Sequence, residues 1–171
     1  MPMCDAYIPD NALSAEVERQ LLKRITDLLL EHEGADPSNE RAQQLAWVFV
    51  HRPEMYVAGQ PAHAPHYKFV CQVPEGQYNE ERRAAVTAAM TQAVVEAEGG
   101  AYPNPERRVW VFTLEIKDGS WGGLGRTIRL PDIYEHVVGP NGRDVAEQLL
   151  AERRRQDADA VFSAARREAI A

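Results

Sequence analysis

The sequence lacks a hydrophobic run long enough to cross a membrane, which takes about 18 residues. The longest clear apolar run is residues 45–50. The start of the chain also lacks a basic stretch followed by an apolar one, the pattern of a secretory signal. Only two cysteines occur, Cys4 and Cys71, and each lies in an apolar segment, so we expect small buried side chains and no disulfide framework. These features predict a cytoplasmic protein with no membrane partner.

An excess of positive charge is also lacking. The formal net charge is −7 at pH 7, whereas nucleic-acid binding favours a basic face, so we expect no nucleic-acid partner. Arginines and acids balance within residues 141–171, so the whole excess of negative charge lies in residues 1–140. A small carboxylic acid substrate would therefore need a local cationic pocket.

Common cofactor and nucleophile motifs are missing. The sequence contains no Gly-x-Gly-x-x-Gly, no P-loop and no Gly-x-Ser-x-Gly motif. His63 and His66 have a spacing that could hold a metal, but no third ligand has a matching spacing, and a polar linker over residues 60–66 explains them better. We expect neither a metal nor a cofactor.

A β-α-β pattern is present in residues 2–60. An extended segment at 3–8 precedes an amphipathic helix that Ser14 caps and Gly34 ends. After a polar loop, the run at 45–50 has the length and composition of a buried strand. These residues form the first repeat.

The second repeat, residues 67–130, has the same order of elements. An extended segment at 68–73 precedes a helix capped by Asn79, and an apolar strand follows at 109–114. Parallel strands need such a helical crossover, and neither repeat could bury its sheet alone. We therefore predict an α/β fold in which two fused β-α-β units form one four-stranded sheet with two helices on one face.

The end of the chain differs in kind. Residues 141–171 are rich in helix formers but carry only a thin apolar stripe. We expect one domain over residues 1–140 and a C-terminal helical extension over 141–171.

Pro2 is the first candidate catalytic residue. A small second residue permits removal of Met1, which would leave the secondary amine of proline at the N-terminus. An amine in an apolar pocket has a lowered pKa, because burial disfavours its charged form. A general base works best with a pKa near neutral pH. Pro2 also leads directly into the first strand of a β-α-β repeat.

Three segments resemble the tautomerase superfamily, and 4-oxalocrotonate tautomerase in particular: residues 73–86, 109–115 and 121–125. The two-repeat length is similar to the fused members typified by cis-3-chloroacrylic acid dehalogenase. The resemblance covers about residues 2–130. It implies a trimer, a catalytic Pro2, a water-activating carboxylate at Glu115 and an aromatic pocket wall at Trp121.

The arginines of the family are absent from their usual positions. The arginine of the family's Glu-Gly-Arg turn falls on Gln77 and near Ala12, and a second arginine falls on Trp47 and Trp110. The helix histidine of the dehalogenase falls on Leu29. The usual clamp for a substrate carboxylate is therefore missing from these positions.

Other residues could replace that clamp. His51 and Arg52 close the second strand of the first repeat, in a His-Arg-Pro sequence similar to one in the related malonate semialdehyde decarboxylases. Arg126 follows the segment that contains Trp121. We predict His51, Arg52, Arg126 and Trp121 as substrate-binding residues, although Arg52 could equally form a surface ion pair.

The expected activity is cofactor-independent keto–enol tautomerisation of a small 2-oxo or 2-hydroxy-dienoic acid, with Pro2 as the general acid and base. One alternative is a hydratase or dehalogenase of unsaturated acids, in which protonated Pro2 is the acid and Glu115 activates water. Another is a catalytically silent trimer with a binding or structural role. Because Pro2 leads into an apolar strand, we expect its neutral form and more tautomerisation than hydration.

Overall fold

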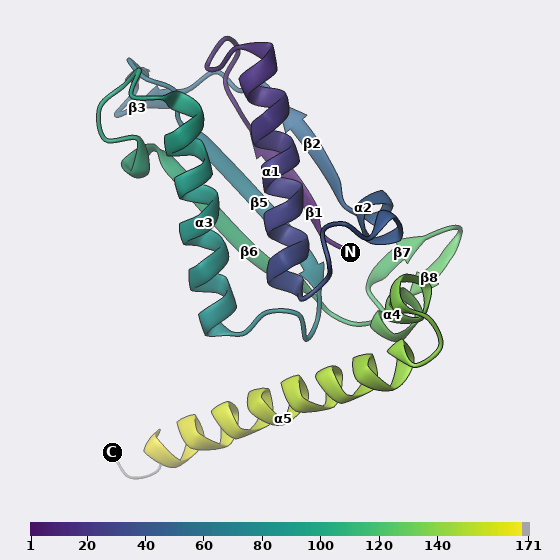
Figure 1. Cartoon of the computed structure of the whole chain (residues 1–171). Helices are drawn as coiled ribbons and strands as arrows, with labels where there is room; N and C mark the ends of the chain where they lie inside the picture. Colours follow the sequence, from purple (N-terminus) through teal and green to yellow (C-terminus); the bar gives the residue numbers. More distant parts are fainter. Residues whose placement is uncertain (169–171) are drawn as a thin grey trace. The chain divides into compact units, whose positions relative to one another are not determined.

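The computed structural model describes residues 1–168 (Figure 1). The elements follow in this order: β1 (Met3–Tyr7), α1 (Ala15–Glu33), α2 (Glu40–Leu45), β2 (Trp47–His51), β3 (Tyr56–Val57), β4 (Gln60–Pro61), β5 (Tyr67–Pro74), α3 (Glu80–Glu98), the 3-10 helix η1 (Pro105–Arg108), β6 (Val109–Ile116), β7 (Trp121–Gly123), β8 (Arg126–Ile128), α4 (Leu130–Val138) and α5 (Gly142–Glu168).

The chain divides into two compact units. The sheet unit contains Met1–Val73 and Tyr78–Glu115. The helical unit contains Pro74–Gln77 and the described chain from Ile116 onward.

The sheet unit is built on a four-stranded sheet with the order β2-β1-β5-β6. Strands β1 and β2 pair in parallel, from Met3 opposite Trp47 to Tyr7 opposite His51. Strand β5 runs antiparallel to β1, with Met3 opposite Gln72. The parallel pair is joined through α1, as a parallel connection requires.

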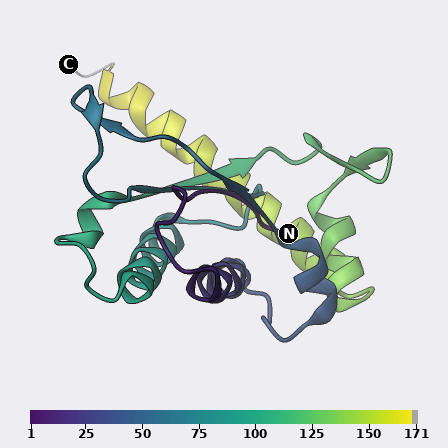
Figure 2. The ribbon, with the colours of Figure 1, turned by 90° about the horizontal axis from the view of Figure 1, so that it is seen from above.

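Helices α1 and α3 lie side by side on one face of this sheet (Figures 1 and 2). Both are capped as predicted, because the side chains of Ser14 and Asn79 accept backbone N–H hydrogen bonds and the left-handed residues Gly34 and Gly99 end the helices. Their inner faces and the inner face of the sheet form the core. Its largest fully buried side chains include Ile8, Ile25, Leu29, Tyr67, Phe69, Tyr78, Val86, Met90 and Val94.

The opposite face of the sheet is apolar, and we call it the uncovered face because α1 and α3 lie on the other side (Figures 1 and 2). It exposes large side chains on both edge strands: Trp47, Phe49, Trp110, Phe112 and Leu114. The strand expected at residues 45–50 is present as β2, but its predicted burial was wrong. The strand begins only at Trp47, since Leu45 ends α2, a helix that was predicted as loop and that Asn39 caps. As an edge strand with one free face, β2 stays largely accessible.

The buried cysteines confirm one further prediction. Cys4 and Cys71 lie opposite each other on β1 and β5 as free thiols, with their sulfur atoms 3.8 Å apart.

The helical unit contains the β7–β8 hairpin and the helices α4 and α5. Leu130 of α4 packs against Ala146 and Leu150 in the first turns of α5. A Cβ atom on Gly142 would lie 2.6 Å from the carbonyl oxygen of Tyr134, so only glycine permits this close approach. Beyond Leu150, no residue of α5 whose side chain is described is buried.

This architecture confirms the predicted α/β class, with four strands under two helices and a C-terminal helix. Among the helices of residues 1–168, none combines the length and the apolar character that a membrane span needs.

Candidate active site at the start of β1

Pro2 is buried where the chain enters the sheet. Its carbonyl oxygen accepts a hydrogen bond of 3.2 Å from the backbone N–H of Trp47, and the next residue begins β1. The preceding amine of Met1 lies 2.7 Å from Oε2 of Glu33. Both side chains of this pair are almost inaccessible, with 6% and 3% exposed. The start of the chain is therefore held in the protein interior.

Glu33 reaches this position because it continues the apolar face of α1. It follows Ile25 and Leu29 at intervals of one helical turn, so its carboxylate points into the core. Burial raises the pKa of Glu33, and the positive amine opposes that rise. The other carboxylate oxygen, Oε1, has no hydrogen-bond partner among the described residues.

Tyr78 places a second unpaired polar group in the same region. Its hydroxyl is buried and has no hydrogen-bond partner within residues 1–168. Burial raises the pKa of Tyr78, and the negative charge of Glu33 raises it further, so the two side chains lie near each other. A buried polar atom without a partner costs about 1–3 kcal/mol. Such atoms in a folded protein mark a candidate site.

Glu115 lies at the same end of the sheet unit. One oxygen of its carboxylate accepts the backbone N–H of Tyr78 at 3.1 Å, and the other accepts a hydrogen bond of 2.8 Å from Arg83. Arg83 also donates to the carbonyl oxygen of Thr113 at 2.7 Å. The structure thus brings Glu115 and Pro2 to one end of the sheet, with Tyr78 between Glu33 and Glu115.

Sequence reasoning missed Glu33, Tyr78 and Arg83. For Glu33 a signal was available, because an acid in register with the apolar residues of a helix is unusual unless it is paired. Tyr78 and Arg83 carried no comparable signal, since their positions depend on contacts with distant strands.

Arg52 and His51 lie at the opposite end of β1. His51 pairs with Tyr7, four residues along the strand from Met3, which corresponds to about 13 Å. Arg52 makes two hydrogen bonds of 2.7 Å to the carboxylate of Glu18 and lowers the pKa of that carboxyl. Within one chain the structure does not bring Arg52 to Pro2, and its role in substrate binding stays a prediction.

His51 belongs to a small cluster on the uncovered face of the sheet. Its Nε2 atom lies 2.6 Å from Oδ1 of Asp5, and its ring stacks on Tyr7 with centroids 4.4 Å apart. The ammonium of Lys68 lies 3.8 Å from the centre of the Tyr7 ring. These contacts hold the His51 ring within the cluster, and its substrate-binding role also stays a prediction.

Trp121 and Arg126 belong to the helical unit. Trp121 is buried on β7 opposite Ile128 of β8. Arg126 is exposed on the same hairpin, 3.6 Å from the carboxylate of Asp132. Their predicted roles as pocket wall and carboxylate binder stay predictions.

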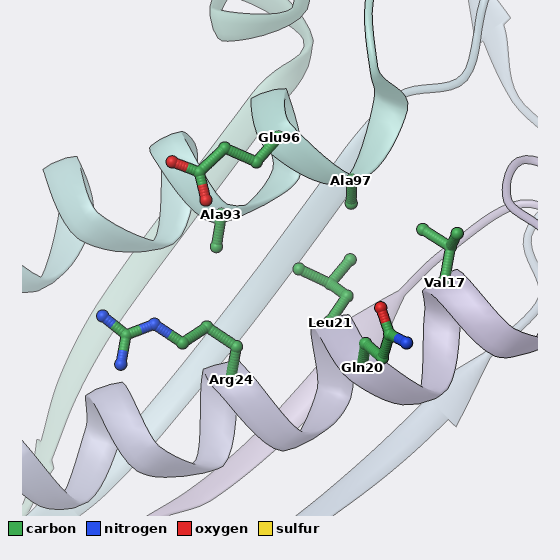
Figure 3. A pocket seen from close by; sticks show the side chains of 7 residues that line it. All are labelled: Val17, Gln20, Leu21, Arg24, Ala93, Glu96 and Ala97. Carbon is green, nitrogen blue, oxygen red and sulfur yellow. The ribbon is translucent and has the colours of Figure 1, made fainter.

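Hollows of the described sheet unit lie away from Pro2, and two of them are well defined. The larger has a volume of about 710 Å³ and lies near the start of β5, where Tyr7, Tyr56, Lys68 and Trp110 contribute to its walls. The smaller, of about 260 Å³, lies between α1 and α3 (Figure 3). It forms because Ala93 and Ala97 of α3 are too short to fill the space opposite Leu21.

The histidines of the linker make no metal centre with other described residues. His66 directs its Nδ1 atom to the carbonyl oxygen of Ala64 at 3.0 Å. Within residues 1–168, no group of three or more His, Cys, Asp or Glu side chains could hold a metal ion. Residues 60–66 were predicted as a linker, and they include β4, which pairs with β3 in a short hairpin.

No protein-family model and no curated protein matches the sequence. Solved structures do match. Pt0534, determined after inactivation by 2-oxo-3-pentynoate, is 28% identical over 74% of this chain and 94% of its own, with a TM-score of 0.60.

Two further structures are less similar in sequence. N1, a member of the cis-3-chloroacrylic acid dehalogenase family, is 16% identical, covers 86% of this chain and 97% of its own, and has a TM-score of 0.62. A fused 4-OT symmetric trimer, Q0, is 18% identical over 74% of this chain and 94% of its own, with a TM-score of 0.59. Together with the order of strands and helices, these likenesses show that the chain has the fold of the tautomerase superfamily.

Proposed function

We propose that the protein is a cofactor-independent keto–enol tautomerase of a small 2-oxo or 2-hydroxy-dienoic acid, acting in the cytoplasm. The nitrogen of Pro2, freed by removal of Met1, is its general acid and base. The observation that carries this proposal is the buried position of Pro2 at the start of β1, in a fold shared with a fused 4-OT.

In this reaction the neutral prolyl nitrogen takes a proton from a carbon or hydroxyl group of the substrate and returns it to another carbon. Burial favours the neutral amine by disfavouring its charged form. A cation would hold the substrate carboxylate and stabilise the dienolate. We assign that task to Arg52 or Arg126, with His51 and Trp121 as neighbouring binding residues.

The working form in this proposal is a homotrimer. Two of the fused 4-OT structures similar to this chain are asymmetric trimers and a third is a symmetric one. The uncovered apolar face of the sheet would be buried between subunits, as exposed apolar patches of this kind mark interfaces. Arg52 and His51 would then have to reach Pro2 from another copy, since they lie far from it in their own chain.

A second candidate function is hydration or dehalogenation of an unsaturated acid. Two observations favour it: Glu115 is held at the same end of the sheet as Pro2, and a buried carboxylate already contacts the N-terminal amine. In this reading protonated Pro2 is the acid and Glu115 activates water. A catalytically silent trimer is the remaining alternative, because the usual arginines are absent.

The proposal is tested with the native N-terminus defined by mass spectrometry. Removal of Met1 is required, because in a retained Met-Pro peptide the proline nitrogen is an amide. The purified protein is then assayed with 2-hydroxymuconate and phenylenolpyruvate for tautomerisation, and with 3-haloacrylates for hydrolytic dehalogenation.

The matched variant is Pro2→Ala, which also permits removal of Met1. We expect the tautomerisation rate to fall by orders of magnitude while the protein stays folded, with a residual rate from the primary amine. A rate equal to wild type would exclude Pro2 as the base. Folded wild-type protein with neither activity would support the silent trimer, and dehalogenation without tautomerisation would support the second candidate.

A further inference from the structure

Both long helices of the sheet unit end in a buried acid. Glu33 is the last residue of α1 and Glu98 the last residue of α3, and a left-handed glycine follows each of them. Both helices have 19 residues and their capping residues correspond. Glu33 and Glu98 are therefore equivalent positions of the two repeats.

In the second repeat, the buried acid Glu98 forms an ion pair with an arginine. The guanidinium of Arg108 makes two hydrogen bonds to Glu98, of 2.7 and 2.5 Å, in a nearly inaccessible position. Glu98 also lies beside Tyr67, which occupies the position of Pro2 in the second repeat. Burial raises the pKa of that tyrosine, and the charge of Glu98 raises it further. In the second repeat the buried acid is thus neutralised by a side chain.

The first repeat has no such arginine. Leu45 and Ala46 directly precede β2, at the positions that Arg107 and Arg108 have before β6. Within residues 1–168, the cation within ion-pair distance of Glu33 is the amine at the chain start, at 2.7 Å. The N-terminal amine is therefore the ion-pair partner of Glu33, as the guanidinium of Arg108 is the ion-pair partner of Glu98.

After removal of Met1, the N-terminal amine that can pair with Glu33 is the nitrogen of Pro2. Backbone bond lengths place successive nitrogens within about 3.7 Å of each other, so the Pro2 nitrogen lies within about 6 Å of Oε2 of Glu33. Its place is held by the hydrogen bond from Trp47 to its carbonyl oxygen. A buried carboxylate is strongly unfavourable without a cation, so the new terminus is the group to neutralise it.

We propose that Glu33 is the positioning residue for the Pro2 nitrogen: in the mature chain its buried carboxylate accepts a hydrogen bond from that nitrogen and stabilises its protonated form. This inference rests on the proposed function in one respect, the removal of Met1. A protonated secondary amine has two N–H groups, and Glu33 has one oxygen without a partner among the described residues. Glu33 thereby sets the fraction of the Pro2 amine that is neutral and acts as a base in tautomerisation, and the fraction that is protonated and acts as an acid in hydration.

The other ionisable groups around this pair come from three strands, from α3 and from the loop before it: Cys4, Cys71, Tyr78, Arg83 and Glu115. The hydrogen bond with Cys71 and burial raise the pKa of Cys4, and burial raises the pKa of Tyr78, so both are neutral at neutral pH. Arg83 and Glu115 neutralise each other through their hydrogen bond. The charge balance at the Pro2 nitrogen therefore depends chiefly on Glu33.

The test is a titration of the prolyl nitrogen by NMR in full-length protein labelled with [15N]proline, after removal of Met1 has been verified by mass. Only the terminal proline carries a titrating nitrogen. The variant Glu33→Gln removes the charge and keeps the shape. The matched control is Glu31→Gln. Glu31 is an exposed acid in the same helical turn as Glu33, and it forms an ion pair with Arg24.

We expect Glu33→Gln to lower the pKa of the Pro2 nitrogen by about 1 or more, as the loss of an adjacent opposite charge does. Glu31→Gln should leave it within about 0.3, because an exposed charge is screened by water. Glu33→Asp, which keeps the charge, should restore most of the wild-type value. An unchanged pKa in folded Glu33→Gln protein would overturn the inference.

A measurement on the wild type does not depend on how the variants fold. If the two groups interact, the side-chain carboxyl of Glu33 and the Pro2 nitrogen should each report the titration of the other. Independent titrations would also overturn the inference. If the pKa of the Pro2 nitrogen changes in Glu33→Gln but the wild-type protein is inactive, only the proposed function is refuted. If the wild-type protein is active but this pKa does not change in Glu33→Gln, only the role of Glu33 is refuted.

Discussion

Arg52 forms an ion pair with Glu18 and is also a predicted binding residue for the substrate carboxylate. Its guanidinium binds both oxygens of Glu18 and donates to the carbonyl oxygen of Ile8 at 3.3 Å. Since the pKa of Glu18 is lowered from its ordinary value of 4.5, the folded protein holds this proton less tightly than the unfolded chain. The stabilisation from the pair is therefore fully present above about pH 4.5 and is lost as the pH falls through the lower pKa of the folded state.

Arg52→Ala should lower the free energy of unfolding by roughly 1 kcal/mol at pH 7, because the pair is partly exposed, and by less at pH 3. Urea unfolding at both pH values measures this. If Arg52 also binds the substrate carboxylate, the same variant should lose about ten- to hundredfold in kcat/KM with an unchanged pH optimum, since a charge-assisted hydrogen bond is worth about 1.5–3 kcal/mol.

The control is Glu18→Gln, which weakens the pair but keeps the guanidinium. It should show a similar loss of stability and little loss of kcat/KM. Equal losses of kcat/KM in both variants would instead assign Arg52 a structural role. A loss in Arg126→Ala without one in Arg52→Ala would transfer the binding role to Arg126.

At the scale of elements, the buried acid at the helix end has a different partner in each repeat: the N-terminal amine for Glu33 and Arg108 for Glu98. The pair of Arg108 and Glu98 fastens η1 to the end of α3, and Arg108 also donates to the carbonyl oxygen of Pro65 just before β5. Both side chains are buried, so removal of the arginine leaves an uncompensated charge in the interior.

Arg108→Leu should therefore cost about 3–5 kcal/mol of the free energy of unfolding. The double variant Arg108→Leu with Glu98→Leu should recover most of that loss, because replacing both partners removes the buried charge. Chemical unfolding of the two variants checks the prediction. A cost below about 1 kcal/mol for Arg108→Leu would show that water reaches Glu98.

At the scale of the whole molecule, the sheet unit has a covered face and an uncovered one. Trp110 is the most exposed large side chain of the uncovered face, at 65%. In the proposed trimer this residue lies at a subunit contact, where a charge without a partner is strongly unfavourable.

Trp110→Glu should therefore shift the protein from trimer to monomer without unfolding the single chain. Light scattering coupled to size-exclusion chromatography measures the mass, and circular dichroism checks the fold. Phe162→Glu is the control, since Phe162 is equally prominent on α5, outside the sheet. A wild-type protein that is already monomeric would contradict the trimer.

The sequence by itself determined most elements, because the signals for them are local. Helical spacing and caps at Ser14 and Asn79 depend on neighbouring residues, and the repeated order of strand and helix predicted the four-stranded sheet. The role of Pro2 as the start of a buried strand was also readable from its neighbours. The short helix α2 was missed, because six residues carry too little periodicity to distinguish them from a loop.

Tertiary structure alone decided which residues meet at the candidate site. The parallel pairing of β1 and β2 sends Arg52 to the end of the sheet away from Pro2, whereas the last turn of α1 brings Glu33 to the chain start. Both outcomes follow from the directions in which elements far apart in the sequence pack together. Burial then gives Glu33 its raised pKa and its need for a cation, because a carboxylate that would be unremarkable in water becomes costly in the interior.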